Sequence, residues 1–391
     1  MTVTLIGCGC GSLTEEARAS INDAELLIGS KRLLCDYGDG RPQTEAVTAS
    51  GIINAIRSTD AENICVLYSG DSGFYSGARL LLPELGEYDV RLLPGVSSVQ
   101  HFAARLQKPW QDWLLCSAHG VECDAVAAVC MGKPVFFLTG GKSGPASICR
   151  ELTEAGLGFL KAYAGDDLGT ERERISEGTA AKLAENAFSP LSVLLVDPAP
   201  RPARRAPGIP DAEFLRAEKV PMTKQEVRAA ILAKLAVSPE DVCWDIGTGT
   251  GSVAVELALW CRAVYSVERE DAALAVAEKN RIKFGAWNLR LVQGEAPAAL
   301  SELPKPDAVF VGGSGGNLDE IVDAIHTANP AARICVSAIT IESLHNSYTV
   351  LQALGYETEV TQISVSRSKP AGGLTLMLAQ NPVWLITGYA K

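Results

Sequence analysis

The chain of 391 residues contains no apolar run long enough to span a membrane, and no basic region precedes its first apolar segment. A membrane helix needs about 20 consecutive apolar residues and a secretory signal begins with basic residues, so we expect neither. Acidic side chains outnumber basic ones by 46 to 35, which gives a formal net charge of −11. This charge disfavours binding to nucleic acid or to anionic membranes. We therefore expect a cytoplasmic protein that binds neither.

The sequence also lacks metal ligands at the spacing that a metal ion requires. Its 11 cysteines form no C-x-x-C pair, and its four histidines are dispersed. Cys8 and Cys10 lie in a glycine-rich loop, but no other cysteine or histidine stands near them at ligand spacing. We expect no metal site. No triad of catalytic side chains stands out either, so the catalytic residues stay unassigned.

The length and composition predict a globular protein with more than one domain. Hydrophobic residues make up 47% of the chain and charged residues 21%, which is ordinary for globular proteins. A chain of this length exceeds the size at which a single core keeps growing. Between Pro198 and Pro221 the sequence is too rich in proline for the interior of a helix or sheet. We predict domains at 1–198 and 220–391, joined by a Pro/Arg-rich linker at 199–219.

The most informative segment runs from Trp244 to Glu256 and reads WDIGTGTGSVAVE. An apolar strand at 242–246 leads through glycines at alternate positions into an amphipathic helix. Glycine permits a positive φ and close approach of the backbone to a ligand, and the start of a helix offers unpaired N–H groups. Ser252 stands where a dinucleotide fingerprint requires its third glycine, so S-adenosylmethionine (SAM) fits this loop better than a dinucleotide does.

Acidic residues flank this loop on two predicted strands. Asp245 directly precedes the first glycine and suits the cationic end of SAM. Glu268 ends the next strand, at 263–267, where an acidic residue commonly bonds the hydroxyls of a ribose. The alternative is a strand-to-helix turn whose glycines are incidental.

The second domain alternates between apolar strands and helical patterns, which is typical of a doubly wound parallel sheet. The predicted strands lie at 242–246, 263–267, 289–292, 307–311 and 333–337. The chain then finishes with consecutive strands at 357–366, 374–378 and 383–386. We therefore expect an antiparallel edge on this sheet.

The first domain also alternates between strands and helices, in two clusters. Strands at 3–6, 64–67 and 90–93 each run into a glycine-bearing loop, and parallel strands would gather these loops at one edge of a sheet, where ligands bind. Further strands follow at 114–116, 134–138, 160–163 and 191–196. We infer two α/β subdomains, at about 1–111 and 112–198, with a cleft between them.

The second domain resembles the decarboxylating methyltransferase domain of cobalamin biosynthesis over nearly its whole length. The matching segments are 221–228 (PMTKQEVR), 244–252 (WDIGTGTGS), 294–297 (GEAP), 307–316 (DAVFVGGSGG) and 380–382 (QNP). Glu295 replaces an aspartate of the family pattern but keeps the carboxylate. The resemblance implies a Rossmann-like class I SAM methyltransferase.

The first domain resembles a tetrapyrrole methylase of the same pathway. The matching segments are 7–11, 69–71 with 74–75, 94–98, 117–120, and 168–169 with 173–175. Ser72 stands where the family has proline, and Val121 stands where it has arginine. The expected fold class is thus α/β: a tetrapyrrole-methylase fold followed by the class I methyltransferase with its antiparallel edge.

The fusion implies an enzyme that methylates a corrin precursor, a tetrapyrrole, at carbons 5 and 15 and removes the carboxylate of the ring C acetate arm. It implies SAM as cofactor, with one molecule for each catalytic domain. Transfer of a methyl group to carbon depends mostly on alignment in a dry pocket, which agrees with the lack of a triad. The resemblance also implies a homo-oligomer, since relatives of the second domain form tetramers.

Three groups of residues follow as candidate binding residues. SAM in the second domain is assigned to Asp245, Gly247, Gly249, Gly251, Glu268, Glu295, Gly312 and Gly313. SAM in the first domain is assigned to Gly7, Gly9, Gly11, Asp71, Tyr75, Ser97 and Ser98. The carboxylates of the substrate are assigned to Lys224, Arg228, Arg367 and Lys369.

Other functions stay open at this point. The acidic charge disfavours a nucleic-acid methyltransferase, and the glycine spacing disfavours a nicotinamide oxidoreductase. The departures at Ser72 and Val121 leave room for a tetrapyrrole-binding protein in which the second domain alone is catalytic. A SAM methyltransferase with a different substrate is a further alternative.

Overall fold

A computed structural model describes residues 1–9, 12–118, 123–200 and 206–390. The candidate residue Gly11 and the departure at Val121 lie outside the described residues. The chain forms two compact units, Met1–Val129 with Lys133–Pro198, and Cys130–Gly132 with Ala199–Lys391. No helix in the described part of the chain is long and apolar enough to cross a membrane.

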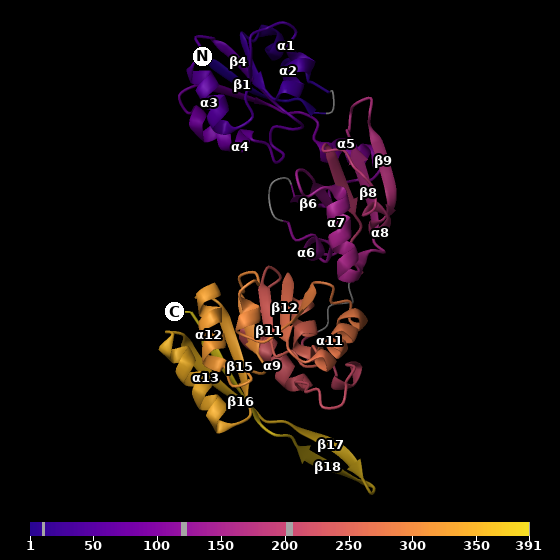
Figure 1. Ribbon diagram of the computed structural model, residues 1–391, viewed down its shortest axis with the longest axis vertical. Helices are drawn as coiled ribbons and strands as arrows, with labels where there is room; N and C mark the ends of the chain where they lie inside the picture. Colours follow the sequence, from indigo (N-terminus) through magenta and orange to yellow (C-terminus); the bar gives the residue numbers. More distant parts are fainter. Residues whose placement is uncertain (10–11, 119–122, 201–205, 391) are drawn as a thin grey trace. The chain divides into compact units, whose positions relative to one another are not determined.

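The first unit begins with a five-stranded parallel sheet in the order β3-β2-β4-β1-β5 (Figure 1). Its strands are β1 (Thr2–Gly7), β2 (Leu26–Gly29), β3 (Gln43–Glu45), β4 (Asn63–Tyr68) and β5 (Asp89–Leu93). Apolar side chains on both faces are covered by helices, as a parallel sheet requires. These helices are α1 (Glu15–Asp23) and α2 (Lys31–Tyr37) on one face, and α3 (Ala49–Arg57) and α4 (Ala78–Leu81) on the other.

A second, mixed sheet completes the first unit, in the order β6-β7-β10-β8-β9. Its strands are β6 (Leu114–Ser117), β7 (Val135–Leu138), β8 (Lys161–Asp166), β9 (Arg174–Thr179) and β10 (Ser192–Val196). Its helices are α5 (Ser98–Leu106), α6 (Ala125–Val129), α7 (Pro145–Leu152) and α8 (Ala180–Leu183). Helix α5 follows the first sheet in sequence but shares a core with the second, because Phe102 packs with Phe136, Tyr163 and Val193.

The second unit is built on a seven-stranded sheet in the order β13-β12-β11-β14-β15-β19-β16. Its strands are β11 (Val242–Ile246), β12 (Ala263–Glu268), β13 (Leu289–Gln293), β14 (Ala308–Val311), β15 (Arg333–Ala338), β16 (Glu357–Ile363) and β19 (Val383–Tyr389). The first five are parallel, whereas β19 pairs antiparallel with both β15 and β16. The predicted α/β class and the antiparallel edge are confirmed.

Helices cover both faces of this sheet (Figure 1). One core joins α9 (Gln225–Leu235) and α10 (Ser252–Ala258) to the sheet through Ile231, Val253 and Cys243. The other joins α12 (Leu318–Ala328) and α13 (Ile341–Ala353) to it through Ile321, Leu351 and Trp244. Helix α11 (Asp271–Lys283) connects β12 to β13.

The end of the chain differs from the prediction in one respect. The sequence predicted one strand over 357–366 and another over 374–378 within the sheet, but the sheet strand β16 ends at Ile363. Residues 366–371 and 374–379 instead pair with each other as a separate hairpin, β17 (Ser366–Ala371) and β18 (Leu374–Ala379). Gly372 and Gly373 form its turn with φ of 56° and 84°, a conformation that glycine adopts without strain. Figure 1 shows this hairpin leaving the sheet.

Candidate functional site

The loop between β11 and α10 has the backbone that its glycines predicted. Gly247, Gly249 and Gly251 all have positive φ, of 76°, 53° and 76°. A Cβ atom on Gly247 would lie 2.8 Å from both the N and O atoms of Gly313, which follows β14. Any side chain at position 247 would therefore drive apart the two strand-end loops.

A short segment before α9 lies against the same loop. The N–H of Thr250 donates to the carbonyl of Pro221 at 3.3 Å. A Cβ atom on Gly249 would lie 2.6 Å from that carbonyl oxygen. The matched segment at 221–228 thus forms a wall of the glycine loop, which the sequence alone did not indicate.

Glu268 ends β12 beside this loop, and the backbone holds both of its carboxylate oxygens. One oxygen accepts from the N–H of Gly249 at 3.0 Å, and the other accepts from the N–H groups of Arg269 and Glu270 at 2.9 and 3.1 Å. A carboxylate has about four lone-pair positions, so a fixed acceptor remains for the hydroxyls of a ribose.

Asp245 lies beneath the loop, with only 1% of its surface exposed. One carboxylate oxygen accepts from the hydroxyls of Thr248 and Ser266. Burial raises the pKa of Asp245 to about 6, and the charge of Glu268 adds to the effect, although the two hydroxyls oppose it. Its described contacts are to the loop and to β12, so it shapes the site from below.

The remaining predicted residues lie at the open side of the loop. Glu295 is largely exposed, and its carboxylate lies 3.4 Å from the guanidinium of Arg269. The N–H groups of Gly312 and Gly313 both donate to the carbonyl of Ile246, which fixes the β14 loop next to the glycine loop. A Cβ atom on Gly313 would meet nothing within 4 Å. A residue at position 313 therefore has room for a side chain, in contrast to position 247.

In the first unit, three loops at the carboxyl ends of strands converge. A Cβ atom on Gly7 would lie 2.7 Å from the carbonyl oxygen of Gly70 and from the nitrogen of Gly95. The carboxylate of Asp71 accepts from the N–H groups of Gly73 and Gly95 at 2.9 and 3.1 Å. The sequence predicted this gathering of loops at one sheet edge.

One departure from the family pattern and one close contact in these loops have simple physical explanations. The hydroxyl of Ser72, where the family has proline, donates to the carbonyl of Leu93 at 3.1 Å. The serine therefore adds a bond between two of the converging loops. Gly9 packs on Val96, since a Cβ atom there would lie 1.7 Å from its carbonyl oxygen. Gly9 thus admits a close contact between loops.

These loops border a cavity of about 720 Å³ within the first unit. Its lining includes the predicted residues Asp71, Tyr75 and Ser98. The hydroxyl of Tyr75 donates to the carbonyl of Leu115 at 3.0 Å. Ser97 instead caps α5, where its hydroxyl and the side chain of Gln100 form a reciprocal capping box. Ser97 therefore positions the helix rather than facing the cavity.

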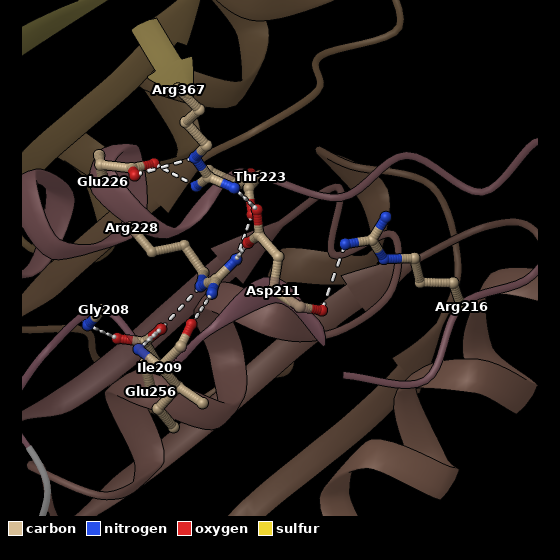
Figure 2. Close-up of polar contacts among 9 residues, drawn as sticks. All are labelled: Gly208, Ile209, Asp211, Arg216, Thr223, Glu226, Arg228, Glu256 and Arg367. Carbon is tan, nitrogen blue, oxygen red and sulfur yellow. Dashed lines mark hydrogen bonds and ion pairs between the residues drawn. The ribbon is translucent and has the colours of Figure 1, made fainter. Parts of the chain in front are cut away.

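The predicted substrate residues do not form one cluster. Arg228 is completely buried, and its guanidinium donates to Glu256 at 2.7 Å, to Asp211 at 2.9 Å, and to the carbonyls of Ile209 and Thr223 (Figure 2). It also stacks on the ring of Phe214 at 4.6 Å. Arg228 is therefore not placed to hold a substrate, and its assignment is corrected. Arg228 thus belongs to an internal ion pair.

The other three basic residues are more accessible. Arg367 on β17 bonds both oxygens of Glu226, at 3.1 and 2.5 Å, and Asp211 at 3.2 Å (Figure 2). It thereby ties the hairpin to the cluster around Arg228, which leaves its 39% exposed side chain little freedom. Lys369 is exposed on the same strand, and Lys224 precedes α9.

The ion cluster also anchors the chain that precedes α9. Glu256 on α10 accepts from the N–H groups of Gly208 and Ile209 at 2.6 and 3.1 Å. Ile209 and Phe214 are buried in the core of the second unit. Residues 208–214 were predicted as linker, yet they pack on this unit. The sequence contained a signal for this packing, because the proline-rich run is interrupted by apolar residues at 209 and 214.

Comparisons with known proteins support both halves of the resemblance. The family described as tetrapyrrole (corrin/porphyrin) methylases matches residues 2–184, and the precorrin methyltransferase domain matches residues 215–388. A precorrin-6Y C(5,15)-methyltransferase [decarboxylating] from Sinorhizobium sp is 31% identical over 95% of this chain and 92% of its own length. The chain belongs to this family.

Other precorrin methyltransferase family members match one half of the chain. A probable cobalt-precorrin-6B C(15)-methyltransferase (decarboxylating) from Pyrobaculum calidifontis is 46% identical over 47% of this chain and 96% of its own length. A precorrin-6Y C5,15-methyltransferase from Geobacter metallireducens, known from a crystal structure, is 37% identical in sequence to this chain. The match covers 48% of this chain and 100% of that chain, with a TM-score of 0.46.

Membership of the precorrin-6Y methyltransferase family confirms the predicted enzyme class and pathway. It also implies SAM as the methyl donor. Among the described residues, no group of three or more His, Cys, Asp or Glu is arranged to hold a metal ion.

The first prediction tests the acceptor in the second unit of this methyltransferase. Glu268→Gln removes the charge that strengthens bonds from ribose hydroxyls, so the Kd for SAM at this site should rise about tenfold or more. Titration calorimetry of the full chain measures this. Glu302→Gln removes an exposed charge and is the matched control. An unchanged Kd in Glu268→Gln would remove Glu268 from the site.

The second prediction concerns the buried carboxyl group of Asp245. Because its pKa is raised in the folded protein, the folded state binds a proton more tightly than the unfolded state does. The resulting stabilisation is present at low pH and is lost as the pH rises to 6 and above. Relative to Asp245→Asn, the wild type should lose about 2 kcal/mol of unfolding free energy between about pH 4.5 and pH 7.5.

Urea denaturation of both proteins across this pH range measures the effect. Asp323→Asn, at an exposed position on α12, should show no such change in the difference from wild type. A pH-independent difference between wild type and Asp245→Asn would show that the carboxyl group titrates normally.

The third prediction separates the buried and exposed parts of the ion cluster. Glu256→Gln leaves the guanidinium of Arg228 without its main counter-charge inside the protein, so unfolding of the second unit should cost about 3 kcal/mol less. Arg367→Gln breaks a partly exposed pair and should lower the free energy of unfolding by about 1 kcal/mol or less. Denaturant unfolding of both variants measures the contrast, and equal losses would contradict it.

Proposed function

We propose that this chain methylates a precorrin-6Y-type corrin at carbons 5 and 15 and decarboxylates the ring C acetate arm, giving precorrin-8. The similarity over 95% of the chain to a relative named for both methylations and for decarboxylation supports this substrate. The glycine loop packed on Gly313 and bordered by the fixed carboxylate of Glu268 is the observation that carries a donor site in the second unit. The substrate is precorrin-6Y or its cobalt form.

We assign methylation of carbon 15 and the decarboxylation to the second unit, and methylation of carbon 5 to the first. A relative whose name carries only the C(15) activity and the decarboxylation covers 47% of the chain. The precorrin methyltransferase domain matches residues 215–388, and the tetrapyrrole methylases match residues 2–184. This division places one SAM in each unit.

When bound, SAM supplies a methyl group attached to a sulfonium. In the second unit, the protein's contribution is to orient this donor. Glu268 fixes the ribose, the carboxylate of Glu295 receives the adenine amino group, and the glycines at 247–251 and 312–313 let the backbone come close. In the first unit, Asp71, Tyr75 and Ser98 line the cavity that would hold donor and ring together.

Other predictions about the whole protein remain proposals. We keep the first domain at 1–198. For the second domain, predicted at 220–391, the contacts of Gly208 and Ile209 favour a start at about residue 208. Assembly into homo-oligomers, with a tetramer formed through the second unit, and a cytoplasmic location also remain predictions. Lys224 and Lys369 stay candidates for binding substrate carboxylates.

The fourth prediction tests the function itself. Incubation of the full chain with precorrin-6Y and SAM should give a product that has gained two methyl groups and lost one carbon dioxide. Mass spectrometry measures this change. Glu268→Gln should slow one methylation and the decarboxylation together. Asp71→Asn, which weakens the loop contact to Gly95, should slow the other methylation alone.

Three outcomes would change the proposal. If Asp71→Asn leaves both methylations unchanged, Asp71 does not belong to the donor site of the first unit; if the wild-type chain adds only one methyl group, the first unit is a tetrapyrrole-binding domain and the second alone is catalytic. If neither methylation occurs with this corrin while SAM still binds, the chain is a methyltransferase for a different substrate.

A further inference from the structure

The cavity of the first unit contains one cationic side chain among three acidic ones. Of the described residues that line it, Arg32 is the sole lysine or arginine, whereas Asp36, Asp71 and Asp167 carry carboxylates. Residues 1–198 as a whole have 16 basic and 25 acidic side chains. A ligand rich in carboxylates would meet an unfavourable field here unless a specific cation received it.

Contacts within the protein position Arg32 but leave part of its guanidinium available. One terminal nitrogen donates to the hydroxyl of Ser69, at the end of β4, at 3.0 Å. The other lies 3.6 Å from the carboxylate of Asp36, and both side chains of this pair are about half exposed. A guanidinium has five N–H donors in a fork that matches a carboxylate, so these two contacts do not exhaust it.

The carboxylates of the lining are already engaged by the protein itself. Asp71 accepts from the N–H groups of Gly73 and Gly95, and Asp167 accepts from the hydroxyl of Ser189 at 2.9 Å. These bonds hold the two carboxylates to neighbouring loops. The charge of Arg32 is therefore opposed mainly by Asp36, at a distance beyond a hydrogen bond.

A second, independent observation at the same cavity is the hydroxyl of Tyr68. Tyr68 is one of the lining residues and is 8% exposed, but its hydroxyl is closed to solvent and has no hydrogen-bond partner among the described residues, so a ligand reaches it only if the side chain shifts. Burial raises its pKa to about 12, so the hydroxyl stays protonated and can donate. A buried hydroxyl without a partner is costly, and a polar atom of a ligand would relieve that cost.

We propose that Arg32 binds a carboxylate of the ligand in this cavity and that the hydroxyl of Tyr68 donates to a second polar atom of the same ligand. The proposal rests on the proposed function for the nature of the ligand. Two sources share this chemistry: an acid arm of the tetrapyrrole, and the methionine carboxylate of the donor.

The test measures binding to the full chain of two probes, uroporphyrin III, a tetrapyrrole with carboxylate arms, and S-adenosylhomocysteine. Arg32→Gln should raise the Kd for one of them about tenfold, since it removes a charge-assisted contact, and Arg32→Lys should restore part of the affinity. Arg57→Gln, at the exposed end of α3 and outside the cavity lining, is the control for loss of charge and should change neither Kd.

Tyr68→Phe gives a readout that a purely structural role would not produce. Removal of an unpaired buried hydroxyl should leave the melting temperature of the ligand-free protein unchanged or higher, while the Kd for the same probe rises. A higher Kd for uroporphyrin III in Arg32→Gln assigns Arg32 to the tetrapyrrole, and a higher Kd for S-adenosylhomocysteine assigns it to the donor. Unchanged affinity for both probes in Arg32→Gln would overturn the proposal.

The binding assay does not require turnover, so it separates this inference from the proposed function. A chain that binds a probe through Arg32 but adds only one methyl group would contradict the catalytic role of the first unit and leave the carboxylate site standing. If Arg32→Gln adds both methyl groups with an unchanged KM for the corrin and an unchanged KM for SAM, the inference alone is contradicted.

Discussion

The second unit depends on the buried contact between Arg228 and Glu256. Glu256 belongs to α10, the helix that follows the glycine loop, and Arg228 belongs to α9. Through backbone atoms of Ile209 and Thr223, this pair holds two stretches of chain against α10. The second stretch includes Pro221, whose carbonyl accepts a hydrogen bond from the N–H of Thr250 in the glycine loop. An ion pair that lies inside the core thus shapes the wall of the glycine loop.

The glycine loops were predictable because a positive φ and a close backbone contact both leave a direct mark on the sequence. Gly247 has φ of 76° and faces the backbone of Gly313, so no other residue fits there. Alternation of strands and helices was equally visible, since it follows from the burial of both sheet faces. The hairpin at 366–379 was not separated from the sheet, because its second strand reads LTLMLA and resembles a sheet strand, whereas its first strand reads SRSKPA and has no apolar pattern.

The role of Arg228 could not be read from the sequence. Its partners Asp211 and Glu256 lie 17 and 28 residues away, and nothing in the local pattern shows that the guanidinium is enclosed. A family-like motif around a basic residue is compatible with a substrate site and with an internal ion pair. Burial decides between them, because a guanidinium with all its contacts inside the core has none left for a ligand. The sequence did not indicate Arg32 and Tyr68 for a related reason. They are candidates because of the side chains that line the cavity around them, which the local sequence does not show.

The two units solve the same electrostatic problem in different ways. Both belong to a chain with a net charge of −11, and both are proposed to bind a polycarboxylate beside a cationic donor. In the second unit, the backbone holds the carboxylate of Glu268 beside the glycine loop, and the hydroxyls of Thr248 and Ser266 hold that of Asp245 beneath it. In the first unit, backbone N–H groups and hydroxyls engage the acidic side chains of the lining, which reduces their competition for Arg32. These hydrogen bonds occupy the carboxylates without removing their charge, so the guanidinium of Arg32 keeps donors for an acidic group although the lining as a whole is negative.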